Sequence, residues 1–118
     1  MVVEDDKPIL EMMEILLRTT GYDPILEPDV LHALRSVEQN PPDLILLDIM
    51  MSPINGWEFL ERLRMDMGLK NIPVILFTAS STVDEKMVTM DDPKLGLLVK
   101  PVTLVELKDG IEKFLGKN

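Results

Sequence analysis

Hydrophobic and polar positions follow two different periods along this chain. Consecutive apolar residues fill 44–47 and 74–77, and such runs are typical of strands in a parallel sheet that is covered on both faces. Elsewhere apolar residues recur three or four positions apart, as in Leu10, Met13 and Leu17, which places them on one face of a helix. The two periods predict strands at 1–3, 23–28, 43–48, 72–78 and 95–99. They predict helices at about 9–17, 30–37, 57–67, 83–91 and 104–114.

The alternation of strands and helices predicts one α/β domain. Five strand–helix units follow one another without an internal repeat or a linker, which favours a doubly wound five-stranded parallel sheet with five helices in three α/β/α layers. The last helix is expected to open with a capping box formed by Thr103 and Glu106. We expect 1–118 to form this single domain, with a short first strand and no output domain after the last helix.

Composition and charge exclude several classes of protein. The 118 residues carry 12 basic and 21 acidic side chains, a net charge of −9, which argues against direct binding of nucleic acid. The absence of cysteine excludes disulfides and thiolate metal sites. No apolar run is long enough to span a membrane, and the first residues do not form a signal peptide. A cytoplasmic protein without membrane contact is therefore expected.

Polar residues gather where the predicted strands end. In an open doubly wound sheet, ligands bind outside the carboxyl ends of the strands. Reading only those ends gives Glu4-Asp5-Asp6, Asp48, Thr78-Ala79-Ser80 and Lys100-Pro101. These residues are far apart in the sequence, and the predicted fold brings them to one edge.

The chemistry of this set favours a divalent cation and phosphoryl transfer. Neighbouring carboxylates repel one another unless a cation intervenes, and oxygen ligands without histidine or cysteine favour Mg²⁺. Lys100 adds a positive charge, Thr78 adds a hydroxyl, and backbone N–H groups around Ala79 can bind an anion. Covalent phosphorylation of Asp48 is the reaction that this set suits best.

Four motifs in register carry a resemblance to a known family. They are "VVEDD", "LLDIMMSPINGWE", "VILFTAS" and "LLVKPVT", with Asp48 eight residues before Gly56 and Thr78 22 residues before Lys100. The sequence resembles the CheY-like receiver domains of response regulators in two-component signalling, over nearly its whole length. The resemblance implies a flavodoxin-like fold with strand order 2-1-3-4-5.

The resemblance also assigns roles to the acidic residues. It implies that Asp48 is the phosphoacceptor and a metal ligand. Asp5 is implied to ligate Mg²⁺ directly, and Glu4 to hold a metal-bound water. The backbone carbonyl of Met50 is implied to be a further ligand.

The phosphate-binding residues are assigned in the same way. Thr78 resembles the switch hydroxyl that moves to the phosphoryl group, and Ala79 lies at a phosphate-binding position. Lys100 is implied to pair with the phosphoryl group, and the Lys100–Pro101 peptide bond is expected to be cis.

The resemblance also implies particular partners. A sensor histidine kinase is expected to donate the phosphoryl group, and a downstream protein to dock on the surface formed by about 83–115. The chain is expected to be a monomer or a phosphorylation-linked dimer. Its role is regulatory, with only its own phosphotransfer and dephosphorylation to catalyse.

Three features depart from the family pattern: the first strand is short, and two positions further along leave alternatives open. Ser52 stands where the family usually has proline, and Leu97 stands where it often has an aromatic switch residue. A pseudo-receiver, which binds partners without being phosphorylated, is therefore the alternative. A hydrolase that turns over through an aspartyl phosphate is disfavoured, because dehalogenase-like phosphatases have a second Asp where this chain has Met50.

Other conspicuous residues have simpler interpretations. Asp6 fits the start of a helix, His32 fits a helix surface, and Trp57 fits packing against the core. The methionines are expected to be mostly core residues.

Overall fold

The computed structural model describes residues 1–78 and 92–116. Its five strands form one sheet in the order β2-β1-β3-β4-β5, and every neighbouring pair is parallel. The strands are β1 (Val2–Val3), β2 (Leu26–Glu27), β3 (Ile45–Asp48), β4 (Val74–Thr78) and β5 (Leu95–Val99). The doubly wound parallel sheet and its strand order are therefore confirmed.

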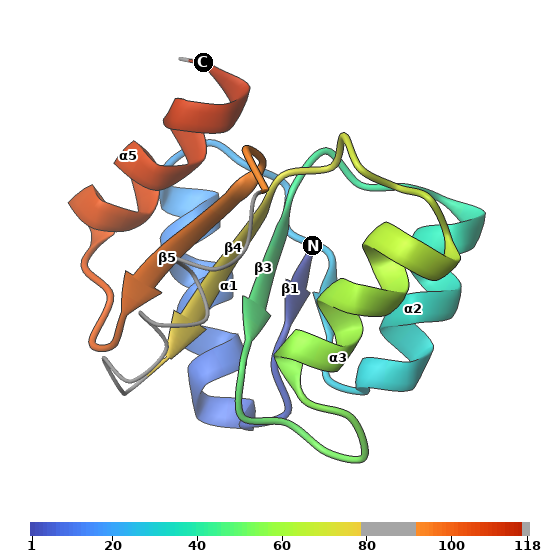
Figure 1. Cartoon of the computed structure of the whole chain (residues 1–118). Helices are drawn as coiled ribbons and strands as arrows, with labels where there is room; N and C mark the ends of the chain where they lie inside the picture. Colours follow the sequence, from blue (N-terminus) through green and yellow to red (C-terminus); the bar gives the residue numbers. More distant parts are fainter. Residues whose placement is uncertain (79–91, 117–118) are drawn as a thin grey trace.

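The helices form a layer on each face of the sheet (Figure 1). On one face lie α1 (Lys7–Thr19) and α5 (Leu104–Leu115); on the other lie α2 (Val30–Gln39) and α3 (Gly56–Glu61). The π-helical turn η1 (Arg62–Asp66) extends α3. The helix predicted for 83–91 lies outside the described residues. No helix within the described ranges is long and apolar enough to cross a bilayer.

Side-chain caps explain where the helices begin. Asp6 accepts a hydrogen bond from the Ile9 N–H at 3.3 Å at the start of α1, as its interpretation as a helix-start residue predicted. The predicted capping box of Thr103 and Glu106 is confirmed at the start of α5. A second capping box, formed by Asn55 and Glu58, opens α3. Each cap satisfies backbone N–H groups that have no partner inside the helix.

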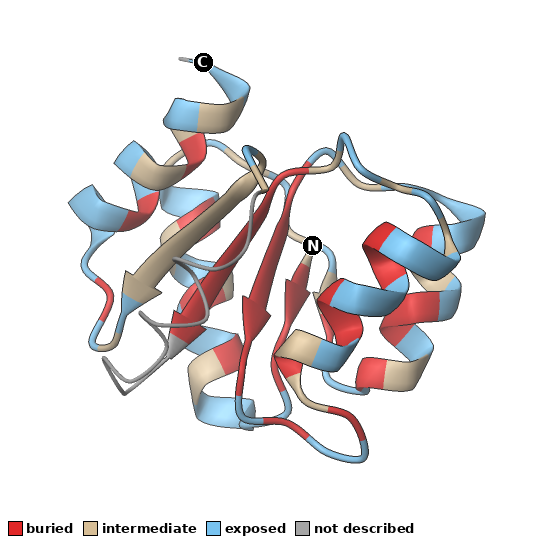
Figure 2. Cartoon of the chain, in the orientation of Figure 1, coloured by how far each residue is buried: buried red, intermediate tan, exposed pale blue. Residues whose placement is uncertain are grey.

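The core consists of two apolar clusters, one on each face of the sheet. The central strands are buried on both faces (Figure 2), which explains their continuous apolar sequences. Trp57 packs against the cluster under α2 and α3, and His32 is exposed at the surface, as predicted. Met13 and Met51 are core residues.

The prediction for the methionines is wrong at three positions. Met12, Met50 and Met65 are exposed by 42%, 77% and 72%. Met12 adjoins buried Met13 on α1, where consecutive residues point in different directions. Met50 lies in the loop after β3, and Met65 lies in η1.

A buried arginine joins segments that the sequence pattern does not connect. The Arg64 Nε donates to Asp92 Oδ2 at 2.9 Å. Its Nη1 donates to the Leu69 and Ile72 carbonyls, both at 2.7 Å, and its Nη2 donates to the Lys94 carbonyl at 3.2 Å. The two charged side chains are only 9% and 13% exposed. Arg64 therefore ties η1 to the chain segments that precede β4 and β5.

Candidate acidic phosphoacceptor site

Strand register directs the candidate site residues to one face of the sheet. Leu46 pairs with Ile75, and two residues later Asp48 pairs with Phe77. Leu46, Ile75 and Phe77 all belong to the cluster under α1 and α5. Because strand side chains alternate between faces, Asp48 points toward the same layer. By the same alternation Glu4, two residues after Val2 of that cluster, has this orientation as well.

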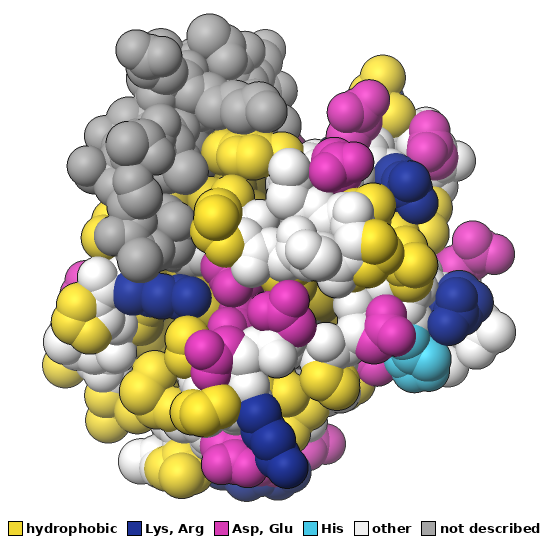
Figure 3. Space-filling view, turned by 90° about the horizontal axis from the view of Figure 1, so that it is seen from below, with side chains coloured by type: hydrophobic (Ala, Val, Ile, Leu, Met, Phe, Trp, Pro, Cys, Tyr) yellow, Lys and Arg dark blue, Asp and Glu magenta, His cyan; other side chains and the backbone are white. Residues whose placement is uncertain are grey.

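Three carboxylates meet at the carboxyl edge of the sheet. Ligand oxygens of Glu4, Asp5 and Asp48 all lie within 4.8 Å of one another. Glu4 and Asp48 are 0% and 3% exposed, whereas Asp5 is open to solvent. Figure 3, which views the molecule from this edge, shows acidic side chains gathered at the centre of the face. The order of the sheet places β1 directly beside β3, and this explains the convergence.

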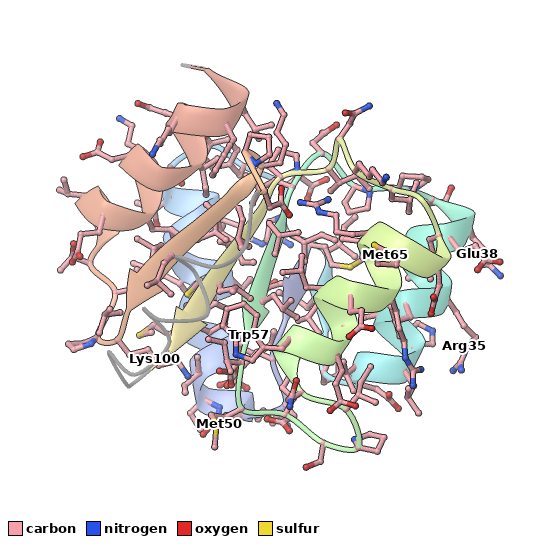
Figure 4. The ribbon with its side chains drawn as sticks, viewed as in Figure 1. Arg35, Glu38, Met50, Trp57, Met65 and Lys100 are labelled. Carbon is pink, nitrogen blue, oxygen red and sulfur yellow. The ribbon has the colours of Figure 1, made fainter. Side chains whose placement is uncertain are left out.

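Lys100 provides the positive charge of the site. Its Nζ lies 3.6 Å from Asp48 Oδ1, and its side chain is 22% exposed. The Lys100–Pro101 peptide bond that follows β5 is cis. Lys100 and Met50 lie at the same end of the sheet in Figure 4, although they come from distant parts of the sequence.

Glu4 is the electrostatically strained member of the cluster. Both of its carboxylate oxygens are buried without a hydrogen-bond partner among the described residues. The pKa of Glu4 is raised to about 8, chiefly by burial and in second place by the neighbouring Asp48 carboxylate, while the Lys100 ammonium acts in the opposite direction. A buried anionic carboxylate without a partner is costly. An oxygen-only set with such a member fits a hard divalent cation such as Mg²⁺.

The loop after β3 orients the Asp48 carboxylate. The Met50 N–H donates to Asp48 Oδ1 at 3.2 Å, and the Gly56 N–H donates to the Ile49 carbonyl at 2.9 Å. The Ser52–Pro53 peptide bond in this loop is cis, a feature that the sequence analysis did not predict.

Of the remaining predicted phosphate-binding residues, Thr78 lies at the end of β4. Thr78 is the last residue of that strand and pairs with Val99. Its side chain, and all of Ala79, lie outside the described residues. The structure thus brings together Glu4, Asp5, Asp48 and Lys100, and it places the backbone of Thr78 on the neighbouring strand.

Gly56 allows α3 to approach the strand that carries Asp48 closely. A Cβ atom at this position would lie 2.6 Å from the Asp48 carbonyl oxygen and 2.8 Å from the Ile49 Cα. Both are backbone atoms, so any added side chain would displace the chain that carries Asp48.

We therefore expect Gly56→Ala to lower the free energy of unfolding by about 1–3 kcal/mol, measured by urea denaturation. The matched control is Gly110→Ala in α5, where a Cβ would meet Ile75 Cδ1 at an ordinary 3.5 Å. This control should be neutral or stabilising by up to about 1 kcal/mol, since alanine favours the helix. Equal stability of the two variants would show that the loop after β3 can move to accommodate the added Cβ without a loss of stability.

Comparison with known proteins identifies the family. The sequence profile of the response regulator receiver domain matches residues 1–112. The chain belongs to this receiver domain family. The receiver domain is 35% identical over 116 residues to the transcriptional regulatory protein PrrA of Mycobacterium tuberculosis, covering 98% of this chain and 48% of PrrA. It is 31% identical over 118 residues to the DNA-binding response regulator MtrA of Mycobacterium leprae, covering 100% of this chain and 51% of MtrA.

Solved structures show the same fold. A response regulator of Chloroflexus aurantiacus superposes with a TM-score of 0.86 at 27% identity, covering 98% of this chain and 95% of the other. The chemotaxis protein CheY4 of Vibrio cholerae superposes with a TM-score of 0.84 at 26% identity, covering 96% of this chain and 94% of CheY4. The receiver domain spans about half the length of the curated relatives that it matches.

Proposed function

We propose that this receiver domain accepts a phosphoryl group on Asp48 from a sensor histidine kinase in a reaction that requires Mg²⁺. The observation that supports it is the arrangement of Asp48, buried between two further carboxylates and 3.6 Å from the Lys100 ammonium. A carboxylate with only a structural role at a strand end would need neither the buried, unpartnered Glu4 carboxylate nor the Lys100 ammonium beside it.

The carboxylates of Glu4, Asp5 and Asp48 and the carbonyl of Met50 would hold Mg²⁺. When bound, the ion would neutralise charge on the transferred group. This assignment agrees with the two orphaned oxygens of Glu4.

The reaction is a displacement at phosphorus. An Asp48 carboxylate oxygen attacks the phosphorus of the donor phosphohistidine, the phosphorus–nitrogen bond breaks, and the imidazole leaves with the bonding electron pair. Lys100 then pairs with the phosphoryl oxygens, and the Thr78 hydroxyl and Ala79 N–H donate to them. The acyl phosphate is hydrolysed slowly, so the domain is a switch and not an enzyme that turns over an external substrate.

The consequence of phosphorylation is a change in partner binding. Movement of Thr78 and Lys100 biases the surface formed by about 83–115, where a downstream protein or a second receiver docks. Leu97, in β5, occupies the usual aromatic switch position, so the coupling runs through an aliphatic side chain here. The domain works in the cytoplasm and does not bind nucleic acid directly, in keeping with its net charge of −9.

Intact mass spectrometry tests this proposal. After incubation with Mg²⁺ and acetyl phosphate, the chain should gain one phosphoryl group, and the adduct should be absent with EDTA. Asp48→Asn, a nearly isosteric change at the same buried position, should show no adduct. A folded parent chain that gains no mass under these conditions would support the pseudo-receiver instead.

A further inference from the structure

The Lys100 ammonium has a second neighbour besides Asp48. It lies 5.1 Å from the centroid of the Phe77 ring and 3.6 Å from Asp48 Oδ1. The latter distance is longer than a charged hydrogen bond, which is about 2.7–2.9 Å. The ammonium is therefore held near the phosphoacceptor without a tight bond to it.

The Phe77 ring is fixed in position by the fold. Phe77 is 1% exposed and belongs to the cluster under α1 and α5, together with Met13 and Leu107. It pairs across β3 and β4 with Asp48 itself, so the two side chains leave the sheet side by side. The ring is thus a rigid surface whose place is set by the same register that places the phosphoacceptor.

An aromatic face suits a lysine that must later bind a phosphoryl group. The ring attracts the ammonium through its quadrupole, but it has no lone-pair acceptor that would direct an N–H bond. All three N–H donors of Lys100 therefore stay available to incoming phosphoryl oxygens. A closer ion pair with Asp48 would instead engage one of these donors on the Asp48 carboxylate.

The surroundings show what the ring prevents. An apolar cavity of about 310 Å³ adjoins Phe77 and Lys100 and is lined by Ile9, Met12, Met13, Pro101 and Val102. Without the aromatic face, the aliphatic stem of Lys100 could pack into this cavity and move the ammonium away from Asp48. Phe77 itself lines this cavity.

We propose that Phe77 is a positioning residue, whose ring holds the Lys100 ammonium beside Asp48 and so favours phosphoryl transfer to this site. The inference rests on the proposed function, because it assigns Phe77 a part in the same reaction. It is distinct from a packing role, since a packing role requires only an apolar side chain of similar size.

Two measurements on three variants test the proposal. The first is NMR of the unmodified chain, in which the ring should shift the Lys100 ε-CH₂ protons upfield. Phe77→Leu should abolish this shift, and Phe77→Tyr should retain it. The second is the initial rate of phosphorylation by phosphoramidate, measured below the unfolding transition of each variant. Phe77→Leu should lower this rate about threefold to tenfold relative to the parent chain, whereas Phe77→Tyr should keep the parent rate.

Phe59→Leu is the matched control for lost packing. Phe59 is 0% exposed in the cluster on the opposite face, so its replacement removes an equally buried ring far from Lys100. Its rate should stay close to that of the parent chain. Equal rate losses in Phe77→Leu and Phe59→Leu, or an unshifted ε-CH₂ resonance in the parent, would overturn the proposal. A parent chain that accepts no phosphoryl group would instead refute the proposed function, while the NMR result would still decide the Phe77–Lys100 contact.

Discussion

Replacing Arg64 with alanine is expected to lower the free energy of unfolding by about 3–5 kcal/mol, the usual cost of breaking a buried ion pair from one side. The change leaves the Asp92 carboxylate, only 13% exposed, without its cation. It also removes the donor from three backbone carbonyls. Urea denaturation followed by circular dichroism measures the loss, and the variant is expected to be close to unfolding at 37 °C.

Arg62→Ala is the matched control for Arg64→Ala. Arg62 lies in the same π-helical turn but is exposed, so its loss should cost less than about 0.5 kcal/mol. Arg64→Lys keeps the charge but not the fork of donors. We expect its loss of stability to lie between those of Arg64→Ala and Arg62→Ala. If Arg64→Ala and Arg62→Ala differ by less than about 1 kcal/mol, the buried network contributes little to stability.

Stability is also expected to fall steeply as the pH rises when no divalent cation is present. The pKa of Glu4 is raised from 4.5 to about 8 in the folded chain, chiefly by burial, so the folded state binds the proton more tightly than the unfolded state. This stabilisation is complete below about pH 4.5 and is lost as pH rises through about 8. We expect a loss on the order of 2 kcal/mol between pH 5 and pH 8 in EDTA, measured by thermal unfolding.

Glu4→Gln should remove most of this pH dependence and raise stability at pH 8, because the neutral amide has no proton to lose. Glu11→Gln, an exposed acid on α1, should leave the parent profile unchanged. Adding Mg²⁺ at pH 8 should stabilise the parent more than Glu4→Gln, since the ion compensates the buried charge. Coinciding profiles for the parent and Glu4→Gln would show that the negative charge of Glu4 does not destabilise the folded chain.

The sequence predicts the fold and the composition of the site because both depend on local signals. Periodicity marks the strands and helices, and Thr103 and Glu106 mark a helix start that the structure confirms. The convergence of Glu4, Asp5 and Asp48 follows from parallel strands that end at one edge.

Other features depend on contacts that leave no local signal. Arg64 lies within the helix predicted at about 57–67, and its carbonyl partners are backbone atoms that any sequence provides. Phe77 fits an ordinary buried strand position, and only the three-dimensional structure shows Lys100 over its ring. Met65 is 72% exposed, and the apolar character of its side chain gives no sign that it points outward.

Reductive mapping of the modified residue tests the central claim most directly. Borohydride reduces an aspartyl phosphate to homoserine, which peptide mass spectrometry locates. After incubation with Mg²⁺ and acetyl phosphate, the account predicts homoserine at position 48, and none at positions 5 or 6 of the same acidic edge. Homoserine at either of those positions, or its absence from a chain that has gained a phosphoryl group, would contradict the assignment of Asp48 as phosphoacceptor.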